Sequence, residues 1–444
     1  MSETTRIKPS YTPIAILAAV TVLALIFPSI PGVIQTEGID SGDTAWMLVA
    51  SALVLIMTPG LAYFYGGMVN SKNVISTMLQ SFIAMGVISI VWVVVGYSLA
   101  FGESVGGFVG NPMTHFMMKG VLDAAPWGTI PAIMFAFFQL KFAVITPALV
   151  TGSMAERINF KSYVVFMILF SLFIYAPLAH MTWASGGFLF EMGVLDFAGG
   201  TVVHMSAGWA ALAASIYLKR RRSHVEGSFL PPANIPYVLL GTGLLWFGWF
   251  GFNAGSALGA NPLAALAFST TNTAAGAAGI AWVLFDAAKG KKVSALGFCI
   301  GVVVGLVAIT PAAGFVTIPH ALVIGVVASI ISNFLAHYKT KTALDDTLDV
   351  FPCHGVGGMI GMVFTGLFAS SAVNSAVKDQ GLIFGDSTLF IKHMVALVLV
   401  SAFAFIMSFV ILKITDIIVP MSVSEEVEMK GLDISQHDEQ LLEA

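Results

Sequence analysis

The chain has 444 residues, of which 57% are hydrophobic and only 10% are charged, whereas soluble globular proteins have about 25% charged residues. With a mean hydropathy of +0.90, this composition excludes a soluble multidomain enzyme and predicts a polytopic membrane protein. The net charge of −4 offers no surface for a polyanion, so nucleic acid is not expected as a partner.

Residues 1–40 have two open interpretations. Arg6 and Lys8 precede an apolar stretch at Ile14–Phe27, which is about as long as the core of a signal peptide. No clear Ala-x-Ala cleavage site follows it. The segment is therefore either a cleaved signal or a retained extra helix.

Residues 41–418 are expected to form the membrane domain. A helix needs about 20 apolar residues to cross the hydrocarbon core, and this part of the chain contains about eleven such segments. They are expected near residues 44–67, 75–100, 129–152, 162–182, 201–218, 234–256, 262–286, 294–315, 318–337, 350–370 and 390–417.

The basic residues predict the orientation. One set of loops holds most of the Lys and Arg, including the run Lys219–Arg222, while the opposite set holds only Lys119, Lys378 and Lys392. The positive-inside rule makes the first set cytoplasmic. The short acidic tail at 419–444 then lies inside, either as a disordered end or as a segment docked on the cytoplasmic face.

Ionisable residues inside membrane spans are rare and usually functional, and here they form a pattern. Asp196 precedes the fifth segment, which contains His204, and Asp349 opens the tenth, which contains His354. These segments hold the same place in two successive blocks of five, and an odd block size inverts the second copy. Inverted repeats place their site near the bilayer midplane, so the two His are expected to face each other there.

Other interpretations of these His were weighed. A lone buried His is more often a core residue, but two at symmetric positions favour a functional pair. A metal site is not expected, because no H-x-x-H motif or carboxylate cluster accompanies either His. No cofactor and no catalytic residue are predicted. Cys299 and Cys353 lie in apolar runs and are interpreted as small core residues.

From about Asp43 to Glu439 the sequence resembles the ammonium transporter family (Amt/Mep/Rh), in its bacterial Amt form. The resemblance is carried, in chain order, by F-Y-G-G-M-V-N-S-K-N at Phe64–Asn73, F-Q-L-K-F-A-V-I-T-P-A-L-V-T-G-S-M-A-E-R at Phe138–Arg157, A-H-M-T-W at Ala179–Trp183, D-F-A-G-G-T-V-V-H at Asp196–His204, G-W-F-G-F-N-A-G-S at Gly248–Ser256, D-V-F-P-C-H-G at Asp349–Gly355 and G-L-D-I-S-Q-H-D-E at Gly431–Glu439.

The resemblance implies a homotrimer in the inner or plasma membrane, surrounded by lipid, with one pore in each subunit. Each pore is built from eleven helices, as a five-plus-five inverted repeat and a final helix. Ammonium is recruited at an outer aromatic site, deprotonated and conducted past a twin-His pair. A PII-family regulator is implied as a partner of the cytoplasmic face.

The resemblance also implies roles for individual residues. The recruitment site maps to Trp183, Ser256, Phe138, Phe142 and Asp196. The pore gate maps to Phe142, Phe252 and Trp249, and the proton relay to His204 and His354. An aromatic face attracts a small cation by roughly 0.5–2 kcal/mol, and an apolar pore behind it disfavours a bare ion.

Without the resemblance these aromatic residues have simpler interpretations. Trp183 has the position of a belt aromatic at a span end, and Phe142 and Phe252 are two of 34 Phe residues. Two positions fit the family imperfectly: Asp438 stands where the family more often has Gly, and Lys141 is a cation between two residues of the gate motif. We expect Lys141 to point away from the pore or to extend outward along its apolar stem.

Two alternatives to ammonium transport remain open. The first is an ammonium sensor, and the second is a neutral gas channel of the Rh type.

Overall fold

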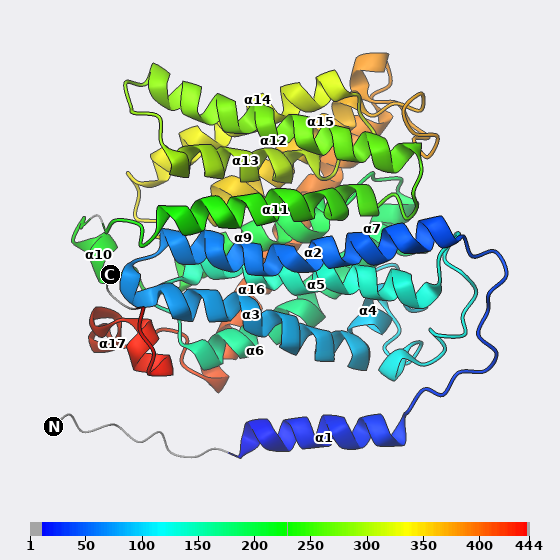
Figure 1. The fold of residues 1–444 in the computed structure, drawn as a ribbon, viewed down its shortest axis with the longest axis horizontal. Helices are drawn as coiled ribbons and strands as arrows, with labels where there is room; N and C mark the ends of the chain where they lie inside the picture. The colour runs from blue at the N-terminus through cyan, green and yellow to red at the C-terminus, as the bar shows by residue number, and fades with distance from the viewer. Residues whose placement is uncertain (1–10, 229, 442–444) are drawn as a thin grey trace.

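The computed structural model describes residues 11–228 and 230–441; Arg6, Lys8 and the last three residues of the tail lie outside this part. Most of the described chain is helical, and most helices run roughly parallel to one another in one bundle (Figure 1). One two-stranded antiparallel sheet joins β1 (Ser104–Val105) to β2 (Val109–Gly110). The predicted all-α fold class is confirmed.

Each of the eleven predicted segments overlaps a helix or a run of joined helices. In chain order these are α2 (Ser41–Met68), α3 (Val74–Val91) with η2 (Trp92–Gly96) and α4 (Tyr97–Phe101), α5 (Ala132–Met154), α6 (Phe160–Phe170) with η4 (Ser171–Tyr175) and α7 (Ala176–Trp183), η5 (Gly200–Met205) with α9 (Ser206–Tyr217), α11 (Ile235–Gly255), α12 (Pro262–Ala288), α13 (Ala295–Ile309), α14 (Ile318–Lys339), η6 (Phe351–Val356) with α15 (Gly357–Phe368), and α16 (Thr388–Ile418). Among the described residues, eight helices are long and apolar enough to cross a membrane. The chain is therefore a multi-pass membrane protein, while the number eleven stays a prediction.

The remaining helices are short, apart from α1 (Thr12–Ile26). They are η1 (Ser71–Asn73), η3 (Phe116–Met118), α8 (Phe188–Glu191), α10 (Arg222–Val225), η7 (Leu382–Phe384), α17 (Glu425–Lys430) and η8 (Asp433–His437). Helix α1 stands apart from the bundle in Figure 1 and has no buried residue. The chain after it is tied to an outer loop, because the Ser29 hydroxyl donates to the Met117 carbonyl (2.6 Å) and the Gly32 N–H to the Asp123 carboxylate (2.8 Å).

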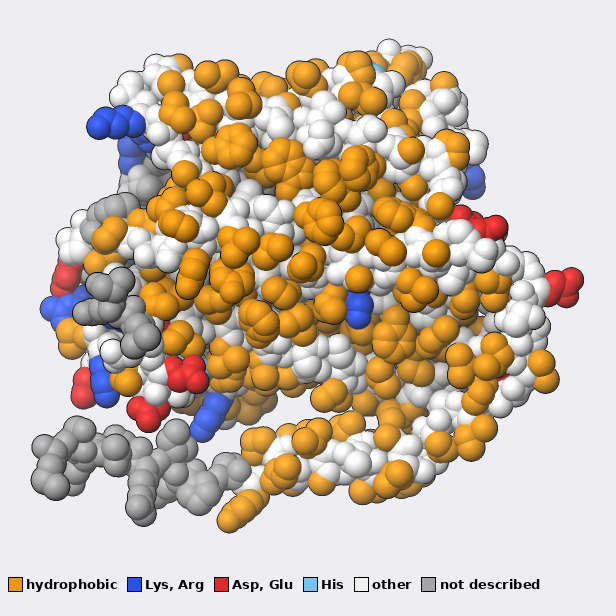
Figure 2. All heavy atoms as spheres, viewed as in Figure 1, with side chains coloured by type: hydrophobic (Ala, Val, Ile, Leu, Met, Phe, Trp, Pro, Cys, Tyr) orange, Lys and Arg blue, Asp and Glu red, His pale blue; other side chains and the backbone are white. Residues whose placement is uncertain are grey.

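The surface divides into an apolar middle and two polar ends. Hydrophobic side chains cover most of the middle in Figure 2, and the end near α10 and α17 gathers most of the Lys and Arg visible in that view. A lipid bilayer favours this arrangement, since charged side chains avoid its hydrocarbon core. The basic end is the one predicted to be cytoplasmic.

Small residues let the two halves of the bundle touch backbone to backbone. A Cβ added to Gly208 of α9 would lie 2.1 Å from the backbone nitrogen of Gly355 in η6. Membrane helices use such residues to approach closely. This contact holds the segments that carry His204 and His354 against each other.

The described part of the tail is docked on the bundle. The Asp433 carboxylate accepts the N–H groups of Ile75 (3.0 Å) and Ser76 (2.7 Å) at the start of α3. The Gln436 side chain accepts the Phe160 N–H at the start of α6 (2.8 Å). These bonds satisfy N–H groups that a helix leaves free at its first turn. Of the two interpretations of the tail, the described residues therefore support docking.

Asp438 does not prevent this docking. Its backbone is left-handed, with φ 56° and ψ 33°. Glycine adopts this conformation most readily, and Asp is among the residues that tolerate it best after glycine. The family's usual Gly at this position is thus explained by the backbone, and Asp can replace it.

Candidate functional site

A cavity of about 140 Å³ brings four of the predicted recruitment residues together. We name it the outer cavity, because the positive-inside rule predicts that this end of the bundle faces outward. It is lined by Trp127, Phe135, Phe138, Gln139, Phe142, Trp183, Phe197, Ser256 and Leu258. Trp127 and Gln139 were not predicted, although Gln139 lies inside the quoted F-Q-L-K-F motif. Most of the lining is aromatic, which is the kind of surface that attracts a small organic or ammonium cation.

The Trp183 and Ser256 side chains each donate a hydrogen bond to a backbone carbonyl. The Trp183 indole N–H donates to the Asp196 carbonyl (3.0 Å), and the Ser256 hydroxyl donates to the Phe252 carbonyl (2.8 Å). The hydroxyl oxygen keeps lone pairs that can accept from a cation. Because its indole is bonded inside the protein and lines the cavity, Trp183 is not a belt aromatic.

Two phenyl rings lie between this cavity and a second, inner cavity. The ring centroids of Phe142 and Phe252 lie 4.3 Å apart at an interplanar angle of 39°, and both side chains are buried. Phe142 also packs edge-on against Phe138 (4.9 Å) and Trp183 (6.0 Å). Phe142 lines the outer cavity while Phe252 lines an inner one, so a solute passing between the two cavities must displace these rings.

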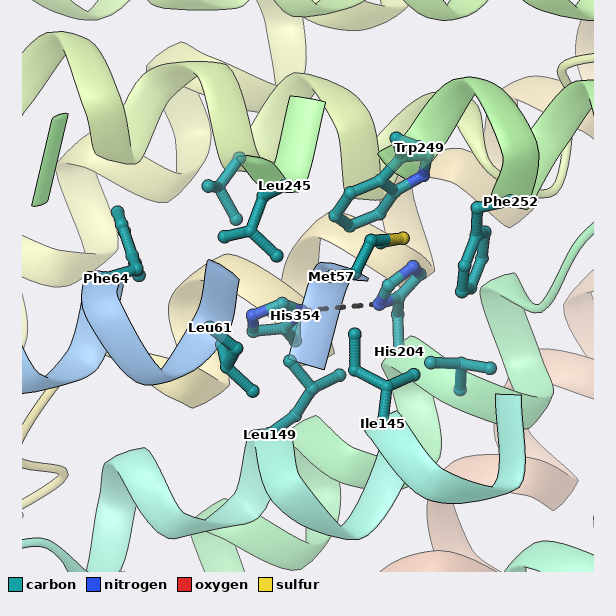
Figure 3. A pocket seen from close by; sticks show the side chains of 12 residues that line it. Met57, Leu61, Phe64, Ile145, Leu149, His204, Leu245, Trp249, Phe252 and His354 are labelled. Atoms are coloured by element: carbon teal, nitrogen blue, oxygen red, sulfur yellow. Dashed lines mark hydrogen bonds between the residues drawn. The ribbon is translucent and has the colours of Figure 1, made fainter. Parts of the chain in front are cut away.

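The inner cavity is small and almost wholly apolar (Figure 3). Its volume is about 10 Å³, which is close to the room that one water needs. It is lined by Met57, Leu61, Phe64, Ile145, Leu149, Val203, His204, Leu245, Trp249, Phe252, Val303 and His354. The two His are the only ionisable side chains in this lining, so a charge inside it has no other partner.

His204 and His354 point toward each other in this cavity (Figure 3). Their Nδ1 atoms are 3.3 Å apart, and both rings are buried. One Nδ1 must donate and the other accept, so the pair shares one proton at this contact. His204 also stacks on Trp249 with centroids 5.3 Å apart, and the Trp249 indole N–H donates to the Thr310 hydroxyl (2.9 Å).

Each of these His lies in a π-helical turn whose first N–H groups are capped by a carboxylate. In η5, Asp196 accepts the N–H groups of Gly199 (2.8 Å), Gly200 (2.7 Å) and Thr201 (2.7 Å). This leaves the Asp196 carboxylate occupied by the backbone, and Asp196 is absent from the lining of the outer cavity. It supports the cavity through its carbonyl, which holds the Trp183 indole.

In η6 the cap is Asp346, which accepts the N–H groups of Val350 (3.2 Å) and Phe351 (2.9 Å). Asp346 precedes His354 by eight residues, as Asp196 precedes His204. The prediction that Asp349 is the counterpart of Asp196 is therefore wrong.

Asp349 has another place in the repeat. Its backbone is left-handed (φ 58°), as is that of Gly199 (φ 116°) three residues after Asp196. Its carboxylate forms an ion pair with the Lys339 ammonium (2.5 Å) instead of capping a helix. Asp349 therefore corresponds to Gly199, whereas the sequence pattern had paired it with Asp196, three residues before Gly199.

A buried ion-pair cluster, which the sequence did not predict, lies next to this second cap. Asp345 binds Arg157 (3.3 Å) and Arg221 (2.7 Å), and Arg221 also binds Glu156 (2.6 Å). Burial acts to raise the pKa of Asp345, but hydrogen bonds from Arg221 and the charge of Arg157 outweigh it and hold the pKa at about 2. The cluster joins three loops at the basic end and so holds Asp346 in place.

Lys141 lines neither cavity. Its side chain is half-buried, and its ammonium lies 6.0 Å from the ring centroid of Phe137 on the same helix. Because Lys141 lines neither cavity, we expect Lys141→Met to leave ammonium current within about twofold of wild type. If its ammonium instead lay about 4 Å from a cation in the gate, the repulsion would be about 4 kcal/mol, and removing it would raise the current. A severalfold rise in current across proteoliposomes would show that the side chain reaches the pore.

Among the described residues, no group of three or more His, Cys, Asp or Glu side chains is arranged to hold a metal ion.

Comparisons with known proteins agree over most of the chain. The family model described as Ammonium Transporter Family matches residues 45–441. The chain is 46% identical over 406 residues to the "Ammonium transporter" of Aquifex aeolicus, covering 90% of this chain and 93% of that protein. It is 46% identical over 402 residues to the "Ammonium transporter" of Bacillus subtilis, covering 90% and 98%.

Solved structures with the same fold include Mep2 of Saccharomyces cerevisiae. The TM-score is 0.82 at 35% identity, and the match covers 88% of this chain and 89% of that one. A structure described as "Sensor Amt Protein" also matches with a TM-score of 0.82, at 29% identity and over 89% and 98% of the two chains.

Proposed function

This chain belongs to the ammonium transporter family, and we propose that it moves ammonium through a pore in each subunit of a homotrimer in the cell membrane. Its activity is transport, so it is not an enzyme. Ammonium is recruited in the outer cavity, gives one proton to the neutral His204 imidazole as it passes the phenyl pair, and crosses the inner cavity beside the His pair as neutral ammonia. The proton follows through the two imidazoles, and the C-terminal tail lies in the cytoplasm.

The observation that carries this mechanism is the contact between His204 and His354 inside an otherwise apolar cavity. A bare cation is strongly disfavoured in such a cavity unless it is paired. Neutral ammonia meets a much smaller barrier. An imidazole pair with one shared proton can accept a proton on one side and release it on the other.

The outer cavity supports the recruitment step. Its aromatic faces attract the cation, and the Ser256 hydroxyl oxygen accepts one of its N–H groups. Asp196 acts there by holding the Trp183 indole and the start of η5 rather than by direct contact. The Phe142–Phe252 pair keeps bulk water out of the inner cavity.

Electrophysiology on proteoliposomes tests this function. Addition of ammonium is expected to give a current, methylammonium a smaller one, and potassium none. Ammonium uptake without current would favour the neutral gas channel. Ammonium binding without uptake would favour the sensor; one structural relative is described as "Sensor Amt Protein".

The docked tail is proposed as a regulatory contact between subunits and with a PII-type protein. Removing residues after Val419 takes away the caps that Asp433 and Gln436 place on α3 and α6. We expect the truncated protein to remain a trimer and to lose most of its transport, by about tenfold. Size-exclusion chromatography with light scattering and uptake assays measure the two effects, and unchanged uptake would contradict the proposal.

A further inference from the structure

The polar side of the outer cavity is not explained by the residues assigned so far. Ser256 and Gln139 are the only residues in its lining with polar aliphatic side chains. An ammonium ion has four N–H groups, and aromatic faces replace the hydrogen bonds it loses to water only in part. Ser256 can accept one of them, which leaves the ion short of acceptors.

Gln139 has the features of a second acceptor. Its side chain is 8% exposed, and its amide oxygen has no hydrogen-bond partner among the described residues. Buried amide oxygens are nearly always bonded, so one without a partner requires an explanation. Its neighbour Phe138 lines the same cavity, and Phe142 follows one turn later on α5.

The amide of Gln139 can turn toward the cavity at little loss. The last torsion of a Gln side chain is broad and roughly two-fold, and the rotation breaks no hydrogen bond of the oxygen to any residue that the structure describes. An oxygen facing a cation forms a charge-assisted hydrogen bond, which is about twice as strong as a neutral one.

We propose that Gln139 is a substrate-binding residue whose amide oxygen accepts an N–H of ammonium recruited between Trp183 and Ser256. The inference rests on the proposed function for the identity of the cation. Methylammonium keeps three N–H groups, which is enough for both Ser256 and Gln139, so its binding is expected to depend on the same acceptor.

The test compares two matched substitutions in the purified full-length protein. Gln139→Met removes the amide from the cavity while keeping a similar volume. Gln80→Met makes the same chemical change at a Gln on α3 that is fully buried and lies outside the cavity, and whose amide atoms both lack a partner among the described residues. Binding of ammonium is followed by tryptophan fluorescence, since Trp127 and Trp183 line the site.

Gln139→Met is expected to raise the half-saturating ammonium concentration about tenfold, which is the worth of one hydrogen bond to a charged group. A shift in the same direction is expected for methylammonium, which has N–H groups for both acceptors. Gln80→Met should leave both unchanged. Gln139→Glu, a second variant that keeps the acceptor and adds charge, should lower the half-saturating ammonium concentration at pH 7.

Two results would overturn the inference: an unchanged half-saturating ammonium concentration in Gln139→Met, or an equal shift in Gln80→Met. If Gln139→Met fails to fold, weaker binding in Gln139→Glu than in wild type overturns it as well. Failure of the proposed function has a different signature, since the wild-type protein would then bind ammonium without transporting it.

Discussion

Replacing both His204 and His354 with alanine is expected to reduce ammonium current in proteoliposomes to background. The inner cavity then has no ionisable group, and a proton cannot cross an apolar lining without one. We expect the fold to survive, because small residues are common in this bundle and the contact between Gly208 and Gly355 remains in place.

The single variants refine this result. Glu at either position adds a negative charge to the cavity, so some conduction is expected to persist while selectivity against potassium falls, because an anion there stabilises any small cation. Trimer integrity by size-exclusion chromatography serves as the control. A double-alanine protein that carries a normal current and still excludes potassium would refute the proton relay.

The sequence was sufficient to predict where the two His meet, for a physical reason. Ionisable side chains inside membrane spans are so few that two of them at corresponding places in successive blocks of five segments stand out. The apolar segments were equally readable, since length and hydropathy alone locate a spanning helix. The structure agrees with both, from the overlap of each segment with a helix to the Nδ1–Nδ1 contact of 3.3 Å.

The contact between Phe142 and Phe252 was predictable only through the family resemblance. Phe142 and Phe252 have no local signature among 34 Phe residues, and their contact of 4.3 Å joins two helices far apart in the sequence. Gln139 was missed for a related reason. An uncharged amide inside an apolar run gives no signal until a cavity is seen beside it and its oxygen is found without a partner.

The mistake at Asp349 came from adjacency. Asp349 lies two residues before η6, so it looked like the equivalent of Asp196, which precedes η5. A carboxylate caps a helix only if it reaches the free N–H groups of the first turn. In both halves a left-handed residue, Gly199 or Asp349, lies between the capping Asp and the helix, so the capping Asp stands earlier in the chain than expected. The equal spacing of eight residues from Asp346 to His354 and from Asp196 to His204 was present in the sequence and would have given the correct pair.

The corrected pairing predicts the effects of three matched substitutions: Asp196→Asn, Asp346→Asn and Asp349→Asn. Both caps are buried, and their carboxylates accept two or three backbone N–H groups each. An amide presents one oxygen and a nitrogen that donates, so at least one N–H is left without an acceptor at roughly 1–3 kcal/mol each. We expect Asp196→Asn and Asp346→Asn to lower thermal stability and to reduce ammonium current at least tenfold.

Asp349→Asn is the control for the two substitutions of the capping residues. Asn tolerates the left-handed backbone of Asp349 as Asp does, and no N–H of η6 loses its cap. The Lys339 ammonium loses its ion pair with Asp349 but keeps its bond to the Asp346 carbonyl. We therefore expect current within about fivefold of wild type, the loss that a bond of up to about 1 kcal/mol produces. Thermal unfolding and current are measured on all three proteins. The opposite outcome would be that Asp349→Asn behaves like Asp196→Asn while Asp346→Asn remains close to wild type. Asp349 would then be the cap of η6 in the membrane. The two halves of the inverted repeat would have to be aligned three residues later than the backbone of η6 indicates.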